Sequence, residues 1–196
     1  MNKCLVIFAE GDTELVFYKR IVAYARGKLG DTVFDTHIVY RNVGGVGGFK
    51  NIAKRKFEKE IRPKYDEKCQ FTIVLCSDTD VFEFSSRPPV DWKAVERDLR
   101  KSGASRVVHV RAKHSIEDWF LLDWDGVISS LHLKKGTKVS GKNGYEKLTQ
   151  LYKMANKIYY KGAKSTDMVD KLDIDKISMA VKDQLRPLYK CLGVRI

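Results

Sequence analysis

The stretch that decides the fold is residues 71–80, FTIVLCSDTD. Its first six residues are apolar except for Thr72, a pattern that is typical of a strand in a parallel sheet covered on both faces. Two carboxylates follow the run directly, at Asp78 and Asp80. Ligands of open α/β sheets bind beyond the carboxyl ends of the strands. We therefore expect a buried parallel strand that delivers two acidic side chains to a binding edge.

A second strand of the same kind is expected at residues 4–9, CLVIFA. Asp12 or Thr13 can cap a helix that follows it and runs to about Arg26. The remaining elements of this part are strands near 36–40 and 106–110 and helices at about 49–61 and 92–101. Strands that alternate with helices predict βαβ units with right-handed crossovers. The fold class is therefore α/β, with a Rossmann-like parallel sheet of about four strands flanked by helices.

The chain changes character beyond Asp123, where lysine and glycine increase and strand patterns disappear. Helices are expected there at 143–160, 166–171 and 174–187. We divide the chain into an α/β domain at residues 1–125 and a lysine-rich helical region at 126–196 packed on it.

The net charge of the chain is concentrated in two segments. Its 196 residues include 37 Lys and Arg against 25 Asp and Glu, a formal net charge of +12. Residues 134–164 hold nine lysines and one acid, and residues 50–68 hold eight basic and four acidic residues, which together account for the whole excess. A local excess of this kind makes a field that can hold a polyanion. The basic residues that we expect at a nucleic-acid surface are Lys50, Lys54, Arg55, Lys134, Lys135, Lys138, Lys142, Lys161 and Lys164.

Three tyrosines in the second basic segment are seven residues apart: Tyr145, Tyr152 and Tyr159. This spacing places them on one face of the expected helix at 143–160. The plain interpretation is the buried side of a helix whose lysines are solvated. The alternative is a phosphate-binding surface in which aromatic and basic side chains alternate.

The composition excludes several classes of protein. With 43% apolar residues and four prolines, the chain is not composed like a disordered protein. No apolar run approaches the roughly 18–20 residues of a membrane span, and the stretch after Met1 is too short for a signal peptide, so we expect a cytoplasmic protein without a membrane partner. The four cysteines show no CxxC pairing, which argues against a zinc knuckle and a disulfide framework. Cys4 and Cys76 are expected to be buried thiols.

Acidic residues follow three of the expected strands. Glu10 comes directly after the first strand, Asp78 and Asp80 after the central one, and Glu117 shortly after the fourth. Carboxylates gathered at one edge repel one another unless a cation joins them, and Mg²⁺ or Mn²⁺ is the usual ion of phosphoryl-transfer sites. Each acid taken alone is more simply a helix cap or a surface residue. The combination beside basic segments favours metal-dependent chemistry on a phosphodiester.

These motifs together resemble the TOPRIM domain. The resemblance lies in Glu10-Gly11-Asp12-Thr13-Glu14 between a strand and a helix, in Asp78-Thr79-Asp80 after a strand, and in Ser115-Ile116-Glu117 before an apolar helix. It covers about residues 3–125. It is strongest to the nuclease branch that includes the overcoming-lysogenization-defect (OLD) proteins and the small stand-alone TOPRIM proteins of phage defence.

The resemblance implies a divalent-metal site and a role for each matching residue. Glu10 matches a metal ligand or general acid/base, and Asp78 and Asp80 match the metal-binding pair. Glu14 matches an extra ligand for a second metal, as do Ser115 and Glu117. A lysine of that branch stabilises the transition-state phosphate, and the candidates for it here are Lys161 and Lys164.

No P-loop follows the glycine run at 44–48, so we expect no intrinsic ATPase. ATP-driven gating would need a partner ATPase chain, and a homodimer is a further hypothesis.

The leading hypothesis is a metal-dependent endonuclease that acts on DNA in preference to RNA, in phage defence or another phage–host conflict. A primase-like nucleotidyltransferase on the same fold is the nearest alternative, although it would normally carry a zinc-binding element. A phosphatase of the haloacid-dehalogenase type also has Asp-x-Asp after a strand, but on its first strand. The non-enzymatic alternative is a basic module that binds nucleic acid or a protein partner through residues 134–164.

Overall fold

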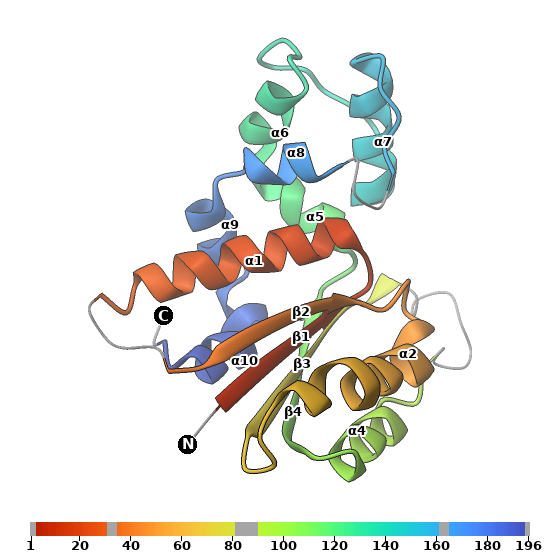
Figure 1. Cartoon of the computed structure of the whole chain (residues 1–196). Helices are drawn as coiled ribbons and strands as arrows, with labels where there is room; N and C mark the ends of the chain where they lie inside the picture. Colours follow the sequence, from red (N-terminus) through yellow and green to blue (C-terminus); the bar gives the residue numbers. More distant parts are fainter. Residues whose placement is uncertain (1–2, 31–34, 81–89, 161–164, 195–196) are drawn as a thin grey trace.

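Four parallel strands form the centre of the chain (Figure 1). The computed structural model describes residues 3–30, 35–80, 90–160 and 165–194. The strands are β1 (Lys3–Ala9), β2 (His37–Asn42), β3 (Gln70–Asp78) and β4 (Ala104–Ala112), and their order in the sheet is β2-β1-β3-β4. All neighbouring pairs are parallel. The expected α/β fold with a four-stranded parallel sheet is confirmed.

The strand order reverses between β1 and β3. The chain first moves from β1 to β2 on one side and then crosses to β3 on the other side of β1. β1 and β3 are in register, with Ile7 opposite Val74 and Phe8 opposite Leu75. In open α/β sheets, such a switch point leaves a crevice at the carboxyl ends of the two strands. Glu10 and Asp78 stand at these two ends.

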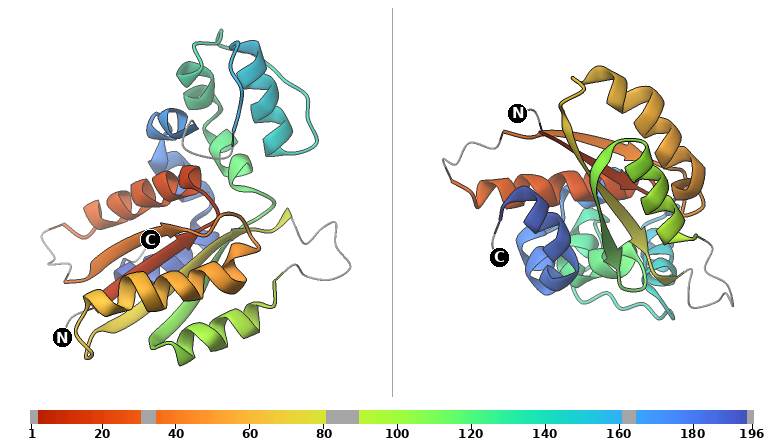
Figure 2. Two further views of the ribbon diagram at one scale, coloured as in Figure 1. Left: turned by 45° about the vertical axis from the view of Figure 1, so that its right-hand side comes forward. Right: turned by 90° about the horizontal axis from the view of Figure 1, so that it is seen from below.

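Helices cover both faces of the sheet, as the two views of Figure 2 show. One face carries α2 (Gly48–Lys56) and α4 (Trp92–Lys101), and the other carries α1 (Asp12–Gly27) and α10 (Lys182–Leu192). Successive residues of a strand point to opposite faces. Accordingly Leu5 and Ile7 pack into the α1 side of the core, whereas Val6 and Phe8 pack into the α2 side.

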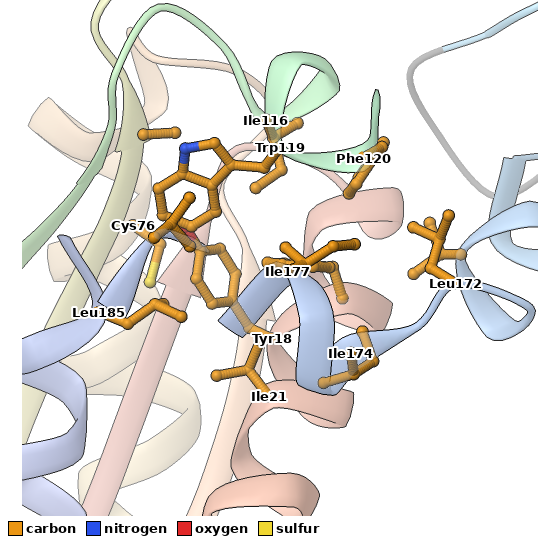
Figure 3. Close-up of a cluster of buried hydrophobic side chains, with 14 of the residues drawn as sticks. Tyr18, Ile21, Cys76, Ile116, Trp119, Phe120, Leu172, Ile174, Ile177 and Leu185 are labelled. Atoms are coloured by element: carbon orange, nitrogen blue, oxygen red, sulfur yellow. The ribbon is translucent and has the colours of Figure 1, made fainter. Parts of the chain in front are cut away.

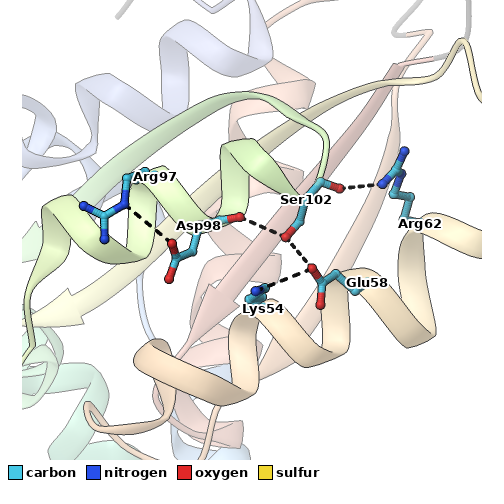
Figure 4. Close-up of polar contacts among 6 residues, drawn as sticks. All are labelled: Lys54, Glu58, Arg62, Arg97, Asp98 and Ser102. Carbon is cyan, nitrogen blue, oxygen red and sulfur yellow. Dashed lines mark hydrogen bonds and ion pairs between the residues drawn. The ribbon is translucent and has the colours of Figure 1, made fainter.

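The expected helix at 49–61 is made of two pieces. α2 continues into a single π-helical turn, Phe57–Ile61, and then into a 3-10 turn, Arg62–Lys64, that contains Pro63. Polar contacts fasten this segment to the end of α4 (Figure 4). The Ser102 hydroxyl donates to Glu58 Oε1 at 2.6 Å, and Arg62 Nη1 donates to the Ser102 carbonyl at 2.9 Å. Asp91 caps α4, because its Oδ1 accepts from the Ala94 amide at 3.0 Å.

The chain beyond β4 is helical. It forms α5 (Ile116–Phe120), a 3-10 turn (Leu121–Asp123), α6 (Trp124–Ser130), α7 (Gly144–Met154), α8 (Thr166–Asp170) and α9 (Ile174–Ala180) before α10. α6 was not expected from the sequence. The expectation of a continuous helix at 143–160 is wrong: α7 ends at Met154, and Asn156 then adopts the left-handed conformation with φ 54°.

The last helices belong to the core of the sheet domain. Figure 3 shows Tyr18 and Ile21 of α1 against Ile177 of α9 and Leu185 of α10, with Trp119 of α5 above them. All five side chains are almost completely buried. The C-terminal helices therefore close the α1 face of the sheet. No helix in the described ranges is long and apolar enough to cross a membrane.

Candidate functional site

Hydrogen bonds connect the ends of three strands at the switch point. Glu10 Oε1 accepts from the backbone amide of Asp78 at 3.0 Å, which joins β1 to β3. Asp78 Oδ1 in turn accepts from the amide of Ile116 at 2.9 Å, which joins β3 to the first residue of α5, after β4. Asp78 is 5% exposed. The structure thus brings Glu10 and Asp78 together, as the strand-end pattern indicated.

Glu14 lies in the first turn of α1 and is buried. Its side chain folds back over Gly11, because a Cβ placed on Gly11 would stand 2.8 Å from Glu14 Oε2. The glycine between Glu10 and Glu14 therefore leaves space for the second carboxylate. The positive end of the α1 dipole favours a carboxylate at this position. Burial distinguishes Glu14 from an ordinary surface acid.

Glu117 is fully buried and accepts a hydrogen bond of 2.9 Å from the hydroxyl of Tyr159. Burial raises the pKa of Tyr159 far above its ordinary value, and the nearby carboxylates of Glu117 and Glu14 raise it further. The phenol therefore keeps its proton and acts as a donor. Glu117 is thus held by a side chain from the segment that follows α7.

The turns after β3 and β4 are fastened to each other. The amides of Thr79 and Asp80 both donate to the carbonyl of His114 at 2.9 Å. The His114 amide donates to Thr79 Oγ1 at 2.8 Å, and the His114 backbone is left-handed with φ 64°. These bonds hold Asp80 beside Ser115. Ser115 is the N-cap residue of α5 and forms a capping box with Asp118, whose Oδ2 accepts from the Ser115 amide at 3.3 Å and from the Ser115 hydroxyl at 2.8 Å. Its role as a metal ligand stays a prediction.

Two pockets open at this edge of the sheet. One, of about 310 Å³, is lined by Glu10, Gly11, Asp12, Glu14, Asn42, Gly44 and Gly45. Gly44 and Gly45 are left-handed, and the Gly45 amide donates to the Glu10 carbonyl at 2.8 Å, so the glycine run forms a turn against the site. The other, of about 620 Å³, is lined by Asp80, His114, Ser115, Asp118, Lys142, Asn143, Tyr145 and Glu146. The first pocket is acidic, and the second combines acidic, basic and aromatic groups.

The donor groups suit a hard cation in their chemistry. Carboxylate oxygens of Glu10, Asp78 and Asp80 are the ligands that Mg²⁺ and Mn²⁺ prefer. Within the described ranges, no three His, Cys, Asp or Glu side chains converge into a ready-made metal cluster. Mg²⁺ usually keeps several waters and takes one or two protein carboxylates together with substrate phosphates. The Glu10–Asp78 pair therefore fits an ion that the substrate helps to hold.

Seven of the basic residues that were expected to bind nucleic acid lie in the described ranges, and all of these but Lys54 are exposed. Lys54 is half-buried and pairs with Glu58 at 3.8 Å. Of the rest, Lys142 lines the 620 Å³ pocket beside Asp80. The exposed members are Lys50, Arg55, Lys134, Lys135, Lys138 and Lys142. Lys161 and Lys164, the candidates for the transition-state lysine, lie outside the described residues.

Three residues at the site were not singled out as site residues from the sequence: Tyr145, Tyr159 and Gly144. The tyrosines carried a signal in their spacing of seven, which was interpreted as a helical face. Gly144 carried none. A Cβ on Gly144 would stand 2.5 Å from the amide nitrogen of Asp118, so the first turn of α7 lies backbone against backbone on α5. This contact brings the lysine-rich segment to the strand ends.

Comparison with known proteins adds no assignment. No family model and no curated protein matches the chain. Among solved structures, an ABC domain in complex with L-Trp from Streptococcus pneumonia aligns with 96% of this chain and 84% of its own, at 9% identity and a TM-score of 0.27. A likeness at this level carries no argument about fold or function.

Proposed function

We propose that the chain is a divalent-metal-dependent nuclease that hydrolyses phosphodiester bonds of DNA, with a site of the kind found in TOPRIM domains. The observation that carries the proposal is the hydrogen-bonded pair of Glu10 and Asp78 at the switch point between β1 and β3. A site at this point of the sheet is where α/β folds bind their ligands. Of the two buried carboxylates, Glu14 lines the 310 Å³ pocket with Glu10, and Glu117 follows Ile116, whose amide donates to Asp78.

Glu10, Asp78 and Asp80 would hold Mg²⁺ or Mn²⁺. When bound, such an ion polarises the scissile phosphate and helps to activate water for the attack. Two carboxylates placed on the same ion lose their mutual repulsion, which offsets the cost of keeping Asp78 buried. The ion is therefore expected to stabilise the fold as well as to enable the reaction.

The remaining residues of the site position the substrate and the acids. Glu10 is proposed as the residue that moves a proton, as the resemblance implies. Tyr159 orients Glu117 through its hydroxyl. The exposed lysines from Lys134 to Lys142 lie on the segment that leads into α7, and they would neutralise the phosphates of a strand that passes over the site. Lys161 and Lys164 remain the proposed transition-state lysines.

The test is nicking of supercoiled plasmid by the purified chain with Mg²⁺ or Mn²⁺. Glu10→Gln keeps an oxygen that accepts from the Asp78 amide but removes the charge, so we expect a folded protein with nicking reduced at least a hundredfold. Asp183→Asn is the matched control, because Asp183 is an exposed carboxylate of α10 that pairs with Arg186. Nicking that survives in Glu10→Gln, or a wild-type chain that leaves plasmid, linear DNA and RNA intact, would overturn the proposal.

A basic binding module is the second candidate, and one observation favours it. Exposed lysines at 134, 135, 138 and 142 precede α7, and Lys142 lines the 620 Å³ pocket. In that case the lysines should matter for binding and the carboxylates should not. A primase-like nucleotidyltransferase would instead incorporate labelled nucleotides on a single-stranded template. A partner ATPase chain or a homodimer would appear as activity that depends on an added chain or on protein concentration.

A further inference from the structure

The 620 Å³ pocket beside Asp80 has two walls. The first belongs to the edge of the sheet and carries Asp80 and His114, together with the residues that begin α5. The second belongs to the start of α7 and carries Lys142 and Tyr145. Pockets that bind small ligands have volumes of about 300–1,000 Å³, so this one has room for a group as large as a nucleotide.

Four of the side chains that line the pocket take part in hydrogen bonds at the starts of α5 and α7. In the first wall, Ser115 and Asp118 bond each other in the capping box of α5. In the second wall, Asn143 Oδ1 accepts from the Glu146 amide at 2.9 Å, and Glu146 Oε2 accepts from the Lys142 amide at 2.8 Å. The other four lining side chains are a carboxylate, an imidazole, an ammonium and a phenol ring: Asp80, His114, Lys142 and Tyr145.

Tyr145 combines exposure with firm support. Its side chain is 44% exposed, and its ring lies 5.8 Å from the ring of Tyr159, centre to centre. Tyr159 is itself buried, packs on Tyr152 at 5.1 Å and holds Glu117. Gly144, next to Tyr145 in the chain, packs directly on the backbone of α5. The ring of Tyr145 is therefore held in place by Tyr159 and by the contact of Gly144 with the α5 backbone. It lines the same pocket as Asp80.

We infer that this pocket holds one unpaired nucleotide of a DNA strand, with its base stacked on Tyr145 and its phosphate beside Lys142 and His114. The inference rests on the proposed function and names its substrate: single-stranded or frayed DNA in preference to intact duplex. A base that is paired and stacked within a duplex does not offer its face to a protein ring. Stacking on an aromatic side chain tolerates every base, so the pocket selects strandedness and not sequence.

The test measures binding apart from cleavage. Glu10→Gln protein is titrated, without divalent metal, into a fluorescent 20-nucleotide single strand and into the blunt duplex of the same sequence, and anisotropy reports both affinities. We expect tighter binding of the single strand. In the same background, Tyr145→Ala should weaken single-strand binding about 5- to 150-fold, the loss of a base–aromatic stack, whereas Tyr145→Phe should retain it. Tyr24→Ala is the control, because Tyr24 lies in the last turns of α1 and bonds Asp175 of α9.

The outcomes separate this inference from the nuclease proposal. Equal affinity for single strand and duplex, or no effect of Tyr145→Ala, would overturn the inference even if the wild-type chain nicks plasmid. Loss of single-strand binding in Tyr145→Ala, together with a wild-type chain that cleaves nothing, would support the pocket and overturn the nuclease. Binding of a free mononucleotide as tightly as the single strand would overturn the assignment of the pocket to a strand.

Discussion

The hydroxyl of Tyr159 donates a 2.9 Å hydrogen bond to Oε1 of Glu117, 42 positions earlier in the chain. Glu117 is placed by α5, which begins just after β4, whereas Tyr159 follows the lysine-rich helix α7. One buried bond thus joins the acidic edge of the sheet to the basic part of the chain. The lysine-rich region is for this reason an integral wall of the site.

Removal of that hydroxyl should damage both stability and activity. Tyr159→Phe takes a donor from a buried carboxylate, and a hydrogen bond to a charged group contributes about 1.5–3 kcal/mol. We expect the free energy of unfolding in urea to fall by about this amount and nicking to decrease, because Glu117 loses its orientation. Tyr152→Phe is the control: its ring is also buried against Tyr159, but its hydroxyl bonds Ser165 and not Glu117, so nicking should be unaffected. Equal losses in the two variants would contradict the assigned role.

The sequence predicted that Tyr159 lies near Tyr152, but not the chain reversal that brings the two rings together. Its spacing of seven from Tyr152 predicted a shared helical face, and the two rings do touch. They touch because the chain turns back after α7, where the Lys157 amide donates to the Tyr152 carbonyl at 2.8 Å and Asn156 is left-handed. Whether a helix continues or the chain reverses at a given residue depends on contacts with distant parts of the chain. The hydrogen bond between Tyr159 and Glu117 could therefore not be predicted from a local sequence pattern.

Asp78 should tolerate asparagine but not alanine. Its Oδ1 accepts from the buried amide of Ile116, and the amide oxygen of asparagine can do the same. Asp78→Asn is therefore expected to fold and to lack nuclease activity. Asp78→Ala leaves the Ile116 amide without its partner, which costs about 1–3 kcal/mol of stability. Urea unfolding and plasmid nicking of both variants provide the check, and an Asp78→Asn enzyme that still nicks would rule out Asp78 as a required metal ligand.

The strands and the strand-end acids were predictable for physical reasons. A strand buried on both faces is mostly apolar, so β1 and the centre of β3 could be recognised from the sequence as apolar runs. An acid that directly follows such a strand reaches the carboxyl edge whatever the order of the strands. The order itself, with β1 between β2 and β3, depends on pairing between distant segments. The use of Ser115 as a helix cap likewise depends on Asp118 turning toward it, which its sequence pattern alone did not indicate.

Gly144 should be intolerant of any side chain. A Cβ there would stand 2.5 Å from the amide nitrogen of Asp118 and 2.7 Å from the carbonyl carbon of Glu117, so α7 would have to move away from α5. We expect Gly144→Ala to lower the midpoint of thermal unfolding and to weaken single-strand binding. Gly27→Ala, in α1, is the control, because no atom lies within 4 Å of its Cβ. It should be neutral or stabilising by up to about 1 kcal/mol. Equal midpoints for the two variants would exclude the close contact.

Stability should fall at alkaline pH. Burial raises the pKa of the Cys4 thiol from 9.0 to about 11 and that of the Tyr40 phenol from 10.0 to about 12. Because the folded pKa exceeds the unfolded one, the stabilisation is complete below about pH 9 and is lost as the pH rises toward 11–12. Each group contributes a slope of at most about 1.4 kcal/mol per pH unit. Urea unfolding at pH 8.0, 9.5 and 10.5 measures how the free energy of unfolding changes with pH. The Cys4→Ala variant should give a shallower slope. A wild-type profile that stays flat to pH 10.5 would contradict buried, neutral groups.

Lys142 should contribute to binding through charge and Tyr145 through stacking, and salt can separate the two. Each lysine that contacts a phosphate displaces a counterion, so removing one lowers the slope of log K against log salt by about 0.7 on single strands. Since Lys142 lines the pocket beside Asp80, Lys142→Gln should weaken single-strand binding at low salt and flatten this slope. Tyr145→Ala should weaken binding equally at every salt concentration and leave the slope unchanged. Lys190→Gln, an exposed lysine of α10, is the control for a change in net charge alone. If Lys142→Gln and Lys190→Gln shift the curve alike, the phosphate contact lies elsewhere and the basic segment acts only through its overall field.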